Sequence, residues 1–360
     1  METENLIKTA AYLMDKIGSR NTPANDILSD YMNTHRYLTA DERRALLDLV
    51  WSAVRARSRL MYAWPDTDWE IRLTRFRETG LPDVSGAPDW VQWEVPEWLP
   101  AHVPDAAREL PALSGSAPII LRAIGERTQI MESLRAEGLT VSPCTQSPYG
   151  IVLENFANLS DTKVYKKGLL EIQDEGAQLV ALDIGVKPKQ DVFDFCAGAG
   201  GKSLIFAQMM GNKGFIQAYD AASKRLFELT RRAARAHISI IKIVTRLPEP
   251  FKKFDHVVVD APCSGTGTWR RVPDMRWKLT EKQLKNITAL QADILNRAER
   301  YVKNGHFLSY ITCSLTQDEN ENQVADFLIK HPNYKVLKTK RYSPLRTQTD
   351  GFFLCLMQKR

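Results

Sequence analysis

The segment Asp191–Ser203 reads DVFDFCAGAGGKS and decides the fold. Its first six residues predict a buried strand, and the glycines that follow end the strand just before a helix that begins at Lys202. Glycines at such a turn let the backbone approach a ligand, and the helix N-terminus offers N–H groups to an anionic group. Taken alone, the pattern is equally typical of a tight strand-to-helix turn.

Strands and helices alternate around this segment from Gln173 to the C-terminus. The predicted strands are DVFDFC, FIQAYD, ISIIKIV, HVVVD, HFLSYIT and FFLCLM, and the predicted helices between them begin at Lys202, Ala222, Thr280 and Asp318. Continuous apolar strands that alternate with helices indicate an α/β fold with a mostly parallel sheet covered on both faces. Ligands bind beyond the carboxyl ends of such strands, so the chemistry should lie there.

Four regions follow from the remaining patterns. Residues 1–64 have the spacing of short amphipathic helices, with a capping box formed by Thr39 and Glu42. Residues 65–116 contain many prolines and tryptophans and predict an irregular connector. Residues 117–160 predict a small α+β subdomain, and residues 161–360 form the α/β domain.

Composition narrows the class of protein. The formal net charge is +6 with a pI near 8.9, which is compatible with a polyanionic partner but is weak evidence for one. The five cysteines are scattered without paired metal-ligand spacing, so we expect reduced thiols and no metal. Neither a membrane span nor a signal peptide is apparent, so we expect a cytoplasmic protein.

Two common nucleotide motifs fail at the glycine-rich loop. A P-loop would need a glycine where Cys196 stands, and a dinucleotide fingerprint would need one at Ser203. The remaining match is the less strictly defined glycine-rich loop of enzymes that bind S-adenosylmethionine. Asp220, at the end of the second strand, is then expected to accept hydrogen bonds from ribose hydroxyls.

Two cysteines stand at the ends of the fourth and fifth strands: Cys263 within Asp260-Ala261-Pro262-Cys263 and Cys313 within Thr312-Cys313-Ser314. Methylation of cytosine at C5 needs a thiolate that adds to C6, an acid at N3 and a sulfonium methyl donor. Asp260 supplies the acid. Chemistry alone does not choose between Cys263 and Cys313 as the nucleophile.

Nearly the whole chain resembles the RsmB/Sun-type RNA (cytosine-C5) methyltransferases. The matching segments are FDFCAGAGGKS, AYD followed by Arg225-Leu226, DAPCSGTGTWRRVPDMRW, SYITCSLTQDENENQV and TDGFFLCLM. The resemblance implies a Rossmann-like class I methyltransferase domain with a seven-stranded sheet. Upstream, it implies a NusB-like RNA-binding domain at HRYLTADERRALLDLVWSAVR. The segments PIILRAI and GLLEIQDEGAQ resemble the small RNA-binding subdomain and its junction with the catalytic domain.

The same resemblance assigns roles to individual residues. It implies that Cys313 is the nucleophile and that Cys263 helps to release the product. It places S-adenosyl-L-methionine against Cys196, Ala197, Gly198, Ala199, Gly200, Gly201, Lys202, Asp220 and Asp260.

The sequence departs from the family pattern at two places. Gly198 and Ala199 stand where alanine and proline are usual, which leaves the glycines and Lys202 in place. After the third strand the family has an aspartate that contacts adenine, whereas this chain reads Thr245-Arg246 with no acid before Glu249. The family's contact with adenine therefore has no matching acid at these positions.

Basic and aromatic residues follow the Cys263 motif. Arg270, Arg271 and Arg276 surround Trp269 and Trp277, a combination that suits phosphates and unstacked bases. The alternative is a solvated loop with its tryptophans packed inward.

We therefore expect a cytosine-C5 methyltransferase that acts on ribosomal RNA of the 16S type, with transfer RNA as the alternative substrate. We expect a monomer that needs neither a metal nor a membrane. The rival hypothesis is a catalytically weak RNA-binding or ribosome-assembly factor that keeps the fold. An amino-group methyltransferase is disfavoured because the Asp260-Ala261-Pro262-Cys263 loop lacks the aromatic residue that such enzymes need.

Overall fold

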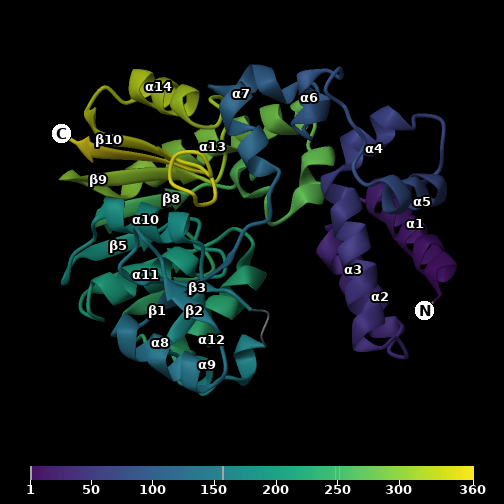
Figure 1. Cartoon of the computed structure of the whole chain (residues 1–360). Coiled ribbons are helices and arrows are strands. Elements are labelled where there is room, and N and C mark those ends of the chain that lie inside the picture. The colour runs from purple at the N-terminus through teal and green to yellow at the C-terminus, as the bar shows by residue number, and fades with distance from the viewer. Residues whose placement is uncertain (1, 156–157, 248, 251) are drawn as a thin grey trace. The chain divides into compact units, whose positions relative to one another are not determined.

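The computed structural model describes residues 2–155, 158–247, 249–250 and 252–360 (Figure 1). The chain forms two compact units. The helical unit contains the residues up to Ser116 together with 268–284, and the sheet unit contains 117–267 together with 285–360. The predicted domain 1–64 and the predicted connector 65–116 thus lie in one unit.

The helical unit is built from short helices, as the spacing of its apolar residues predicts. They are α1 (Thr3–Ser19), α2 (Ala24–Thr34), α3 (Ala40–Arg55), α4 (Arg57–Ala63), α5 (Trp69–Thr79), α6 (Asp89–Gln92) and α7 (Ala106–Glu109), with 3₁₀ helices at Leu99–His102, Pro111–Leu113 and Pro273–Trp277. The capping box at the start of α3 is confirmed: Thr39 N donates to Glu42 Oε2 at 2.8 Å, and Glu42 N donates to Thr39 Oγ1 at 3.3 Å. Leu13, Leu46 and Val50 lie in the apolar core of this unit.

Residues 268–284 complete the helical unit, although the sequence analysis assigned them to the α/β domain. The Trp269 side chain is fully buried there. Asp274 Oδ2 accepts the N–H of Ala24 at 2.9 Å and so caps the start of α2. The stretch that follows the Cys263 motif is therefore a structural part of this unit.

The sheet unit contains a seven-stranded sheet. Its strands are β5 (Asp191–Asp194), β6 (Phe215–Tyr219), β7 (Ile241–Val244), β8 (Phe254–Asp260), β9 (Val302–Thr312), β10 (Tyr334–Tyr342) and β11 (Phe352–Lys359), in the order β10-β11-β9-β8-β5-β6-β7. Strands β9, β8, β5, β6 and β7 run parallel to one another, whereas β11 pairs antiparallel with both β9 and β10. The predicted mostly parallel seven-stranded sheet is confirmed.

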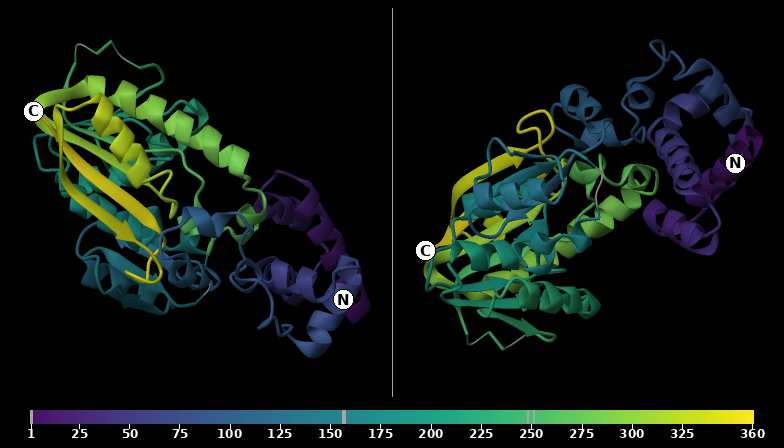
Figure 2. Two further views of the ribbon diagram at one scale, coloured as in Figure 1. Left: turned by 90° about the horizontal axis from the view of Figure 1, so that it is seen from above. Right: turned by 60° about the horizontal axis from the view of Figure 1, so that its bottom comes forward.

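Helices cover both faces of this sheet (Figure 2). They are α10 (Glu175–Ile184), α11 (Gly201–Met209) and α12 (Leu226–Arg235) on one face, and α13 (Glu281–Ala298) and α14 (Glu321–Lys330) on the other. Neighbouring residues of β5 point to opposite faces, with Val192 packed toward α11 and Phe193 toward α13. Full burial of such side chains stabilises the fold by about 1.5–3 kcal/mol each.

A second, small sheet lies in the same unit and confirms the predicted α+β subdomain. Its strands are β1 (Ile119–Ala123), β2 (Val141–Pro143), β3 (Gly150–Leu153) and β4 (Leu170–Ile172), in the antiparallel order β2-β3-β1-β4, with helices α8 (Arg127–Ala136) and α9 (Lys163–Lys166). Strand β4 lies beyond the predicted boundary at residue 160. The small sheet therefore extends further along the chain than its sequence pattern indicated.

Candidate active site

The glycine-rich loop connects the end of β5 to the start of α11. Gly200 has φ +86°, and a Cβ atom there would lie 2.2 Å from Leu229 Cδ1. Gly198 has φ +52°, and a Cβ atom there would lie 2.8 Å from Arg225 Nη2. The loop conformation thus needs glycine at both positions for steric and backbone reasons.

Asp220 directly follows β6 and accepts hydrogen bonds from the glycine-rich loop and from its own loop after β6. Its Oδ2 accepts the N–H of Gly198 at 2.8 Å, and its Oδ1 accepts the N–H of Ala222 at 2.8 Å. The carboxylate therefore lies against the glycine-rich loop, where the sequence placed it. Each oxygen retains a further lone pair, which suits the predicted contact with ribose hydroxyls.

Lys202 and Asp260 form an ion pair between the first turn of α11 and the end of β8. The distance from Lys202 Nζ to Asp260 Oδ2 is 2.7 Å. The lysine side chain is 7% exposed and the aspartate side chain is 33% exposed, so the carboxylate is the more accessible partner. The two predicted site residues are thus brought together at the strand ends.

Asp194, the last residue of β5, is fully buried behind the loop. The Ser203 hydroxyl donates to its Oδ2 at 2.6 Å. Burial raises the pKa of Asp194 to about 7. The sequence analysis did not single out this residue, because an acid inside an apolar strand carries no motif of its own.

The two cysteines meet at the ends of the neighbouring strands β8 and β9. Their sulfur atoms are 3.2 Å apart, and Cys313 N donates to the Sγ atom of Cys263 at 3.3 Å. The hydrogen bond with Cys313, together with the protein packed around the sulfur, holds the pKa of Cys263 well above its usual range. Cys144 and Cys355 are buried, and burial raises the pKa of both thiols, as is usual for cysteines that only pack in a core.

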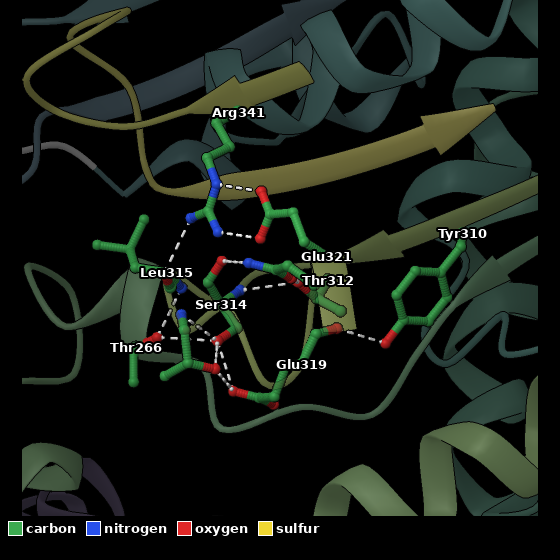
Figure 3. A network of polar contacts seen from close by, with 10 residues as sticks. Thr266, Tyr310, Thr312, Ser314, Leu315, Glu319, Glu321 and Arg341 are labelled. Atoms are coloured by element: carbon green, nitrogen blue, oxygen red, sulfur yellow. Dashed lines mark hydrogen bonds and ion pairs between the residues drawn. The ribbon is translucent and has the colours of Figure 1, made fainter. Parts of the chain in front are cut away.

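Glu319 accepts hydrogen bonds from the two loops that carry the cysteines, and it was not among the predicted site residues. Figure 3 shows its contact with Ser314. Its Oε1 accepts the N–H of Ser264 at 2.7 Å and the side-chain amide of Gln291 at 3.1 Å. Its Oε2 accepts the hydroxyls of Ser264, Ser314 and Thr316. We predicted that the helix begins at Asp318, but α14 begins only at Glu321, and the preceding turn directs Glu319 inward.

The small sheet also supports the glycine-rich loop. Gln173 Nε2 donates to the carbonyl of Gly201 at 3.0 Å, and Arg232 Nη1 donates to the carbonyl of Ala199 at 2.7 Å. Arg232 in turn pairs with the buried Glu171 of β4 at 2.9 Å. These contacts join strand β4 of the small sheet and the residue that follows it to the loop that the sequence assigned to the cofactor.

The residues predicted to bind RNA have different environments. Arg276 is fully buried and donates to the carbonyls of Glu94 at 3.0 Å and Leu113 at 3.1 Å, so it presents no surface to RNA and its predicted RNA contact is wrong. Arg270 is buried, and Trp277 is partly buried beneath Arg57, whose guanidinium lies 5.2 Å from the ring centroid.

Arg271 has a more open environment than Arg270 and Arg276. It lines a cavity of about 470 Å³ within the helical unit. Arg55 and Trp51 of α3 line the same cavity. Asp48 lines this cavity too, so its lining carries both signs of charge, and the RNA contact of Arg271 stays a prediction.

Strand β7 ends at Val244 and is followed by Thr245 and Arg246, as the sequence indicates. Neither carries a carboxylate for adenine, so the departure from the family pattern remains. Among the described residues, no cluster of three or more His, Cys, Asp or Glu side chains could hold a metal ion. No helix in the described part of the chain is long and apolar enough to cross a membrane.

Known proteins resemble this chain in sequence. Residues 181–358 match the family model described as 16S rRNA methyltransferase RsmB/F. The probable ribosomal RNA small subunit methyltransferase B of Bacillus subtilis is 29% identical over 296 residues, which are 75% of this chain and 66% of that protein. The protein of the same name from Synechocystis is 33% identical over 257 residues, 65% of this chain and 57% of that protein.

Solved structures show the same fold. The crystal structure of PH0851 superposes with a TM-score of 0.82 at 22% identity and covers 100% of this chain and 99% of that one. NSun6 from Pyrococcus horikoshii, solved with SFG, superposes with a TM-score of 0.64 at 20% identity and covers 71% of this chain and 94% of that one.

The sheet order and the strand-end loops define a Rossmann-like methyltransferase fold whose cofactor is S-adenosyl-L-methionine, as predicted. Within that class, residues 181–358 are similar to the 16S rRNA methyltransferase RsmB/F family. It spans 57% to 66% of the length of the first curated relatives that it matches.

Proposed function

We propose that the protein transfers a methyl group from S-adenosyl-L-methionine to C5 of a cytosine in small-subunit ribosomal RNA. The observation that carries this proposal is the pair of sulfur atoms of Cys263 and Cys313, 3.2 Å apart at the ends of adjacent strands. Asp260 stands on the same loop as Cys263. The names of the curated relatives support ribosomal RNA as the substrate.

The residues of the chain account for the covalent steps. The Cys313 thiolate adds to C6 of the base, and Asp260 donates a proton to N3, which takes up the charge that this addition would place there. Lys202 holds Asp260 Oδ2, so we assign Oδ1 to the base. S-adenosyl-L-methionine supplies the methyl group to C5. The C5 proton then passes to water, the C6–S bond breaks, the N3 proton returns to Asp260 and the sulfur of Cys313 leaves as a thiolate.

The environment of Cys263 fits a role in product release. Its contact with Cys313 raises the pKa of Cys263 and so favours the protonated thiol, the form that can donate a proton. A protonated Cys263 can donate its S–H to the departing Cys313 sulfur at the observed separation. We therefore assign attack to Cys313 and assistance in release to Cys263.

Trapping of the adduct tests this assignment. With substrate RNA and S-adenosyl-L-methionine, Cys263→Ala should give an RNase-sensitive, slow-migrating band on denaturing gels, whereas Cys313→Ala and the double variant should give none. A band in Cys313→Ala that is lost in Cys263→Ala would move the nucleophile to Cys263. Bisulfite sequencing of cellular RNA with and without the gene tests the modification itself.

RNA contacts are proposed on both units. Arg55 and Arg271 line one cavity in the helical unit. In the sheet unit, the exposed Lys163, Lys166 and Lys167 lie on α9 or directly after it, beside the small sheet. Such cations suit phosphate contacts, which position a protein on RNA without reading its sequence. The target base must be unstacked, because a thiolate cannot reach C6 inside a helix.

A second candidate function is a ribosome-assembly factor with weak catalysis. The absence of an acid at Thr245 and Arg246 favours it, because the adenine contact of the family is missing. Calorimetry with S-adenosyl-L-methionine separates the two functions, since an enzyme must bind its methyl donor. The predicted monomeric state and cytoplasmic location stay predictions.

A further inference from the structure

The Glu319 carboxylate joins the two loops that carry the cysteines. Ser264 directly follows Cys263, Ser314 directly follows Cys313, and both serines donate to the same carboxylate. Because the bonded residues are the chain neighbours of the cysteines, any displacement of the carboxylate moves both sulfur-bearing loops.

The contacts of Glu319 require an acceptor at every position. Its two oxygens receive one backbone N–H, one side-chain amide and three hydroxyls. An ionised carboxylate only accepts, whereas an amide would turn an NH₂ group toward some of these donors. The side chain is fully buried, so loss of these donors would leave its oxygens without hydrogen-bond partners.

Additional contacts hold the same loops in register. Thr266 Oγ1 accepts the N–H of Leu315 at 2.8 Å, and Asn320 Nδ2 donates to the carbonyl of Ser314 at 2.9 Å (Figure 3). Tyr310 donates its hydroxyl to the carbonyl of Glu319 at 2.7 Å and so fixes the backbone of the turn. The Glu319 carboxylate therefore lies on a rigid segment. A residue that fixes the separation of two other groups must itself be held rigidly.

We propose that Glu319 is the positioning residue of the cysteine pair: by binding Ser264 and Ser314 on one carboxylate, it fixes the separation of the Cys263 and Cys313 sulfur atoms. What the pair does to RNA rests on the proposed function. The positioning itself can be measured on the thiols without RNA.

Glu319→Gln tests this role while keeping the size of the side chain. We expect RNA methylation to fall by about 10²-fold, the loss typical of a displacement of about 1 Å at a reacting group, with unchanged affinity for S-adenosyl-L-methionine. Mass spectrometry after limited alkylation should show a changed ratio of labelling between Cys263 and Cys313 across pH. Asp183→Asn is the matched control, because that carboxylate accepts from Lys338, Lys340 and Tyr342 away from the cysteines.

Thr316→Val covers the case in which Glu319→Gln does not fold, because it removes a single donor at 2.9 Å with little change of shape. It should shift the alkylation ratio in the same direction by a smaller factor. Wild-type alkylation and methylation in a folded Glu319→Gln protein, or in Thr316→Val, would overturn the proposal. If the wild-type protein methylates no cytosine but Glu319→Gln still shifts the alkylation ratio, the proposed function fails and the positioning role stands.

Discussion

Arg276→Met should destabilise the helical unit without changing the sheet unit. The substitution leaves the carbonyls of Glu94 and Leu113 buried without their donor, and each orphaned group costs about 1–3 kcal/mol. Burial lowers the pKa of Arg276 to about 10, which reflects a desolvation cost that methionine avoids. The net loss should therefore be about 2–4 kcal/mol, within the range of large core effects.

Tryptophan fluorescence makes this measurement specific to one unit. All eight tryptophans lie in the helical unit: Trp51, Trp64, Trp69, Trp90, Trp93, Trp98, Trp269 and Trp277. With a urea dependence of about 1–3 kcal/mol per molar, the fluorescence midpoint should fall by roughly 1–2 M. Binding of S-adenosyl-L-methionine, which reports on the sheet unit, should be unchanged before the transition.

The control is Arg108→Met, which removes an exposed arginine of α7 that pairs with Asp105 and should move the midpoint little. A wild-type midpoint in Arg276→Met together with weakened RNA binding would refute the structural role of Arg276. It would restore this residue to the RNA contacts that the sequence suggested.

Three further changes test the sheet unit. Asp260→Asn should lower single-turnover methylation by orders of magnitude, because an amide cannot protonate N3; a near-normal rate would remove Asp260 from acid catalysis. Gly200→Ala should weaken S-adenosyl-L-methionine binding by about tenfold or more in calorimetry, because its Cβ would press on Leu229 at a positive φ, and unchanged affinity would contradict the close approach. The pKa of Asp194 is raised from 3.8 to about 7 in the folded protein. Protonated Asp194 therefore stabilises the folded protein fully below pH 3.8, and this stabilisation is lost as the pH rises through 7. Asp194→Asn should flatten that slope in circular-dichroism urea midpoints, and identical slopes would show that Asp194 is ionised in the folded protein.

Most of the fold was predictable because parallel strands carry their own signal. Buried strands such as β5 and β8 are continuous apolar runs, and their carboxyl ends must meet at one edge of the sheet. Motifs far apart in the sequence, such as those of Lys202 and Asp260, were therefore expected to come together, and they do.

What the sequence did not predict depends on pairing between distant segments. Strand β10 carries Lys335, Lys338 and Lys340 and was missed, because an edge strand of a sheet resembles a polar loop in composition. Glu319 lies in an acidic run that looks like an exposed helix start, and its burial depends on a turn that the periodicity does not mark. Arg276 resembled an RNA ligand for the same reason, since its carbonyl partners lie far away in the sequence.

The dependence of the helical unit on residues 268–284 bears on the order in which the chain folds during synthesis. The residues up to Ser116 leave the ribosome first, yet the cap of α2 lacks Asp274, and the carbonyls of Glu94 and Leu113 lack Arg276, until the intervening residues 117–267 have been made. Domains usually complete themselves from the N-terminus onward during translation. Here the helical unit stays incomplete until a segment from the second half of the chain has been made. A nascent chain that stalls before residue 268 would expose this incomplete unit to chaperones and proteases.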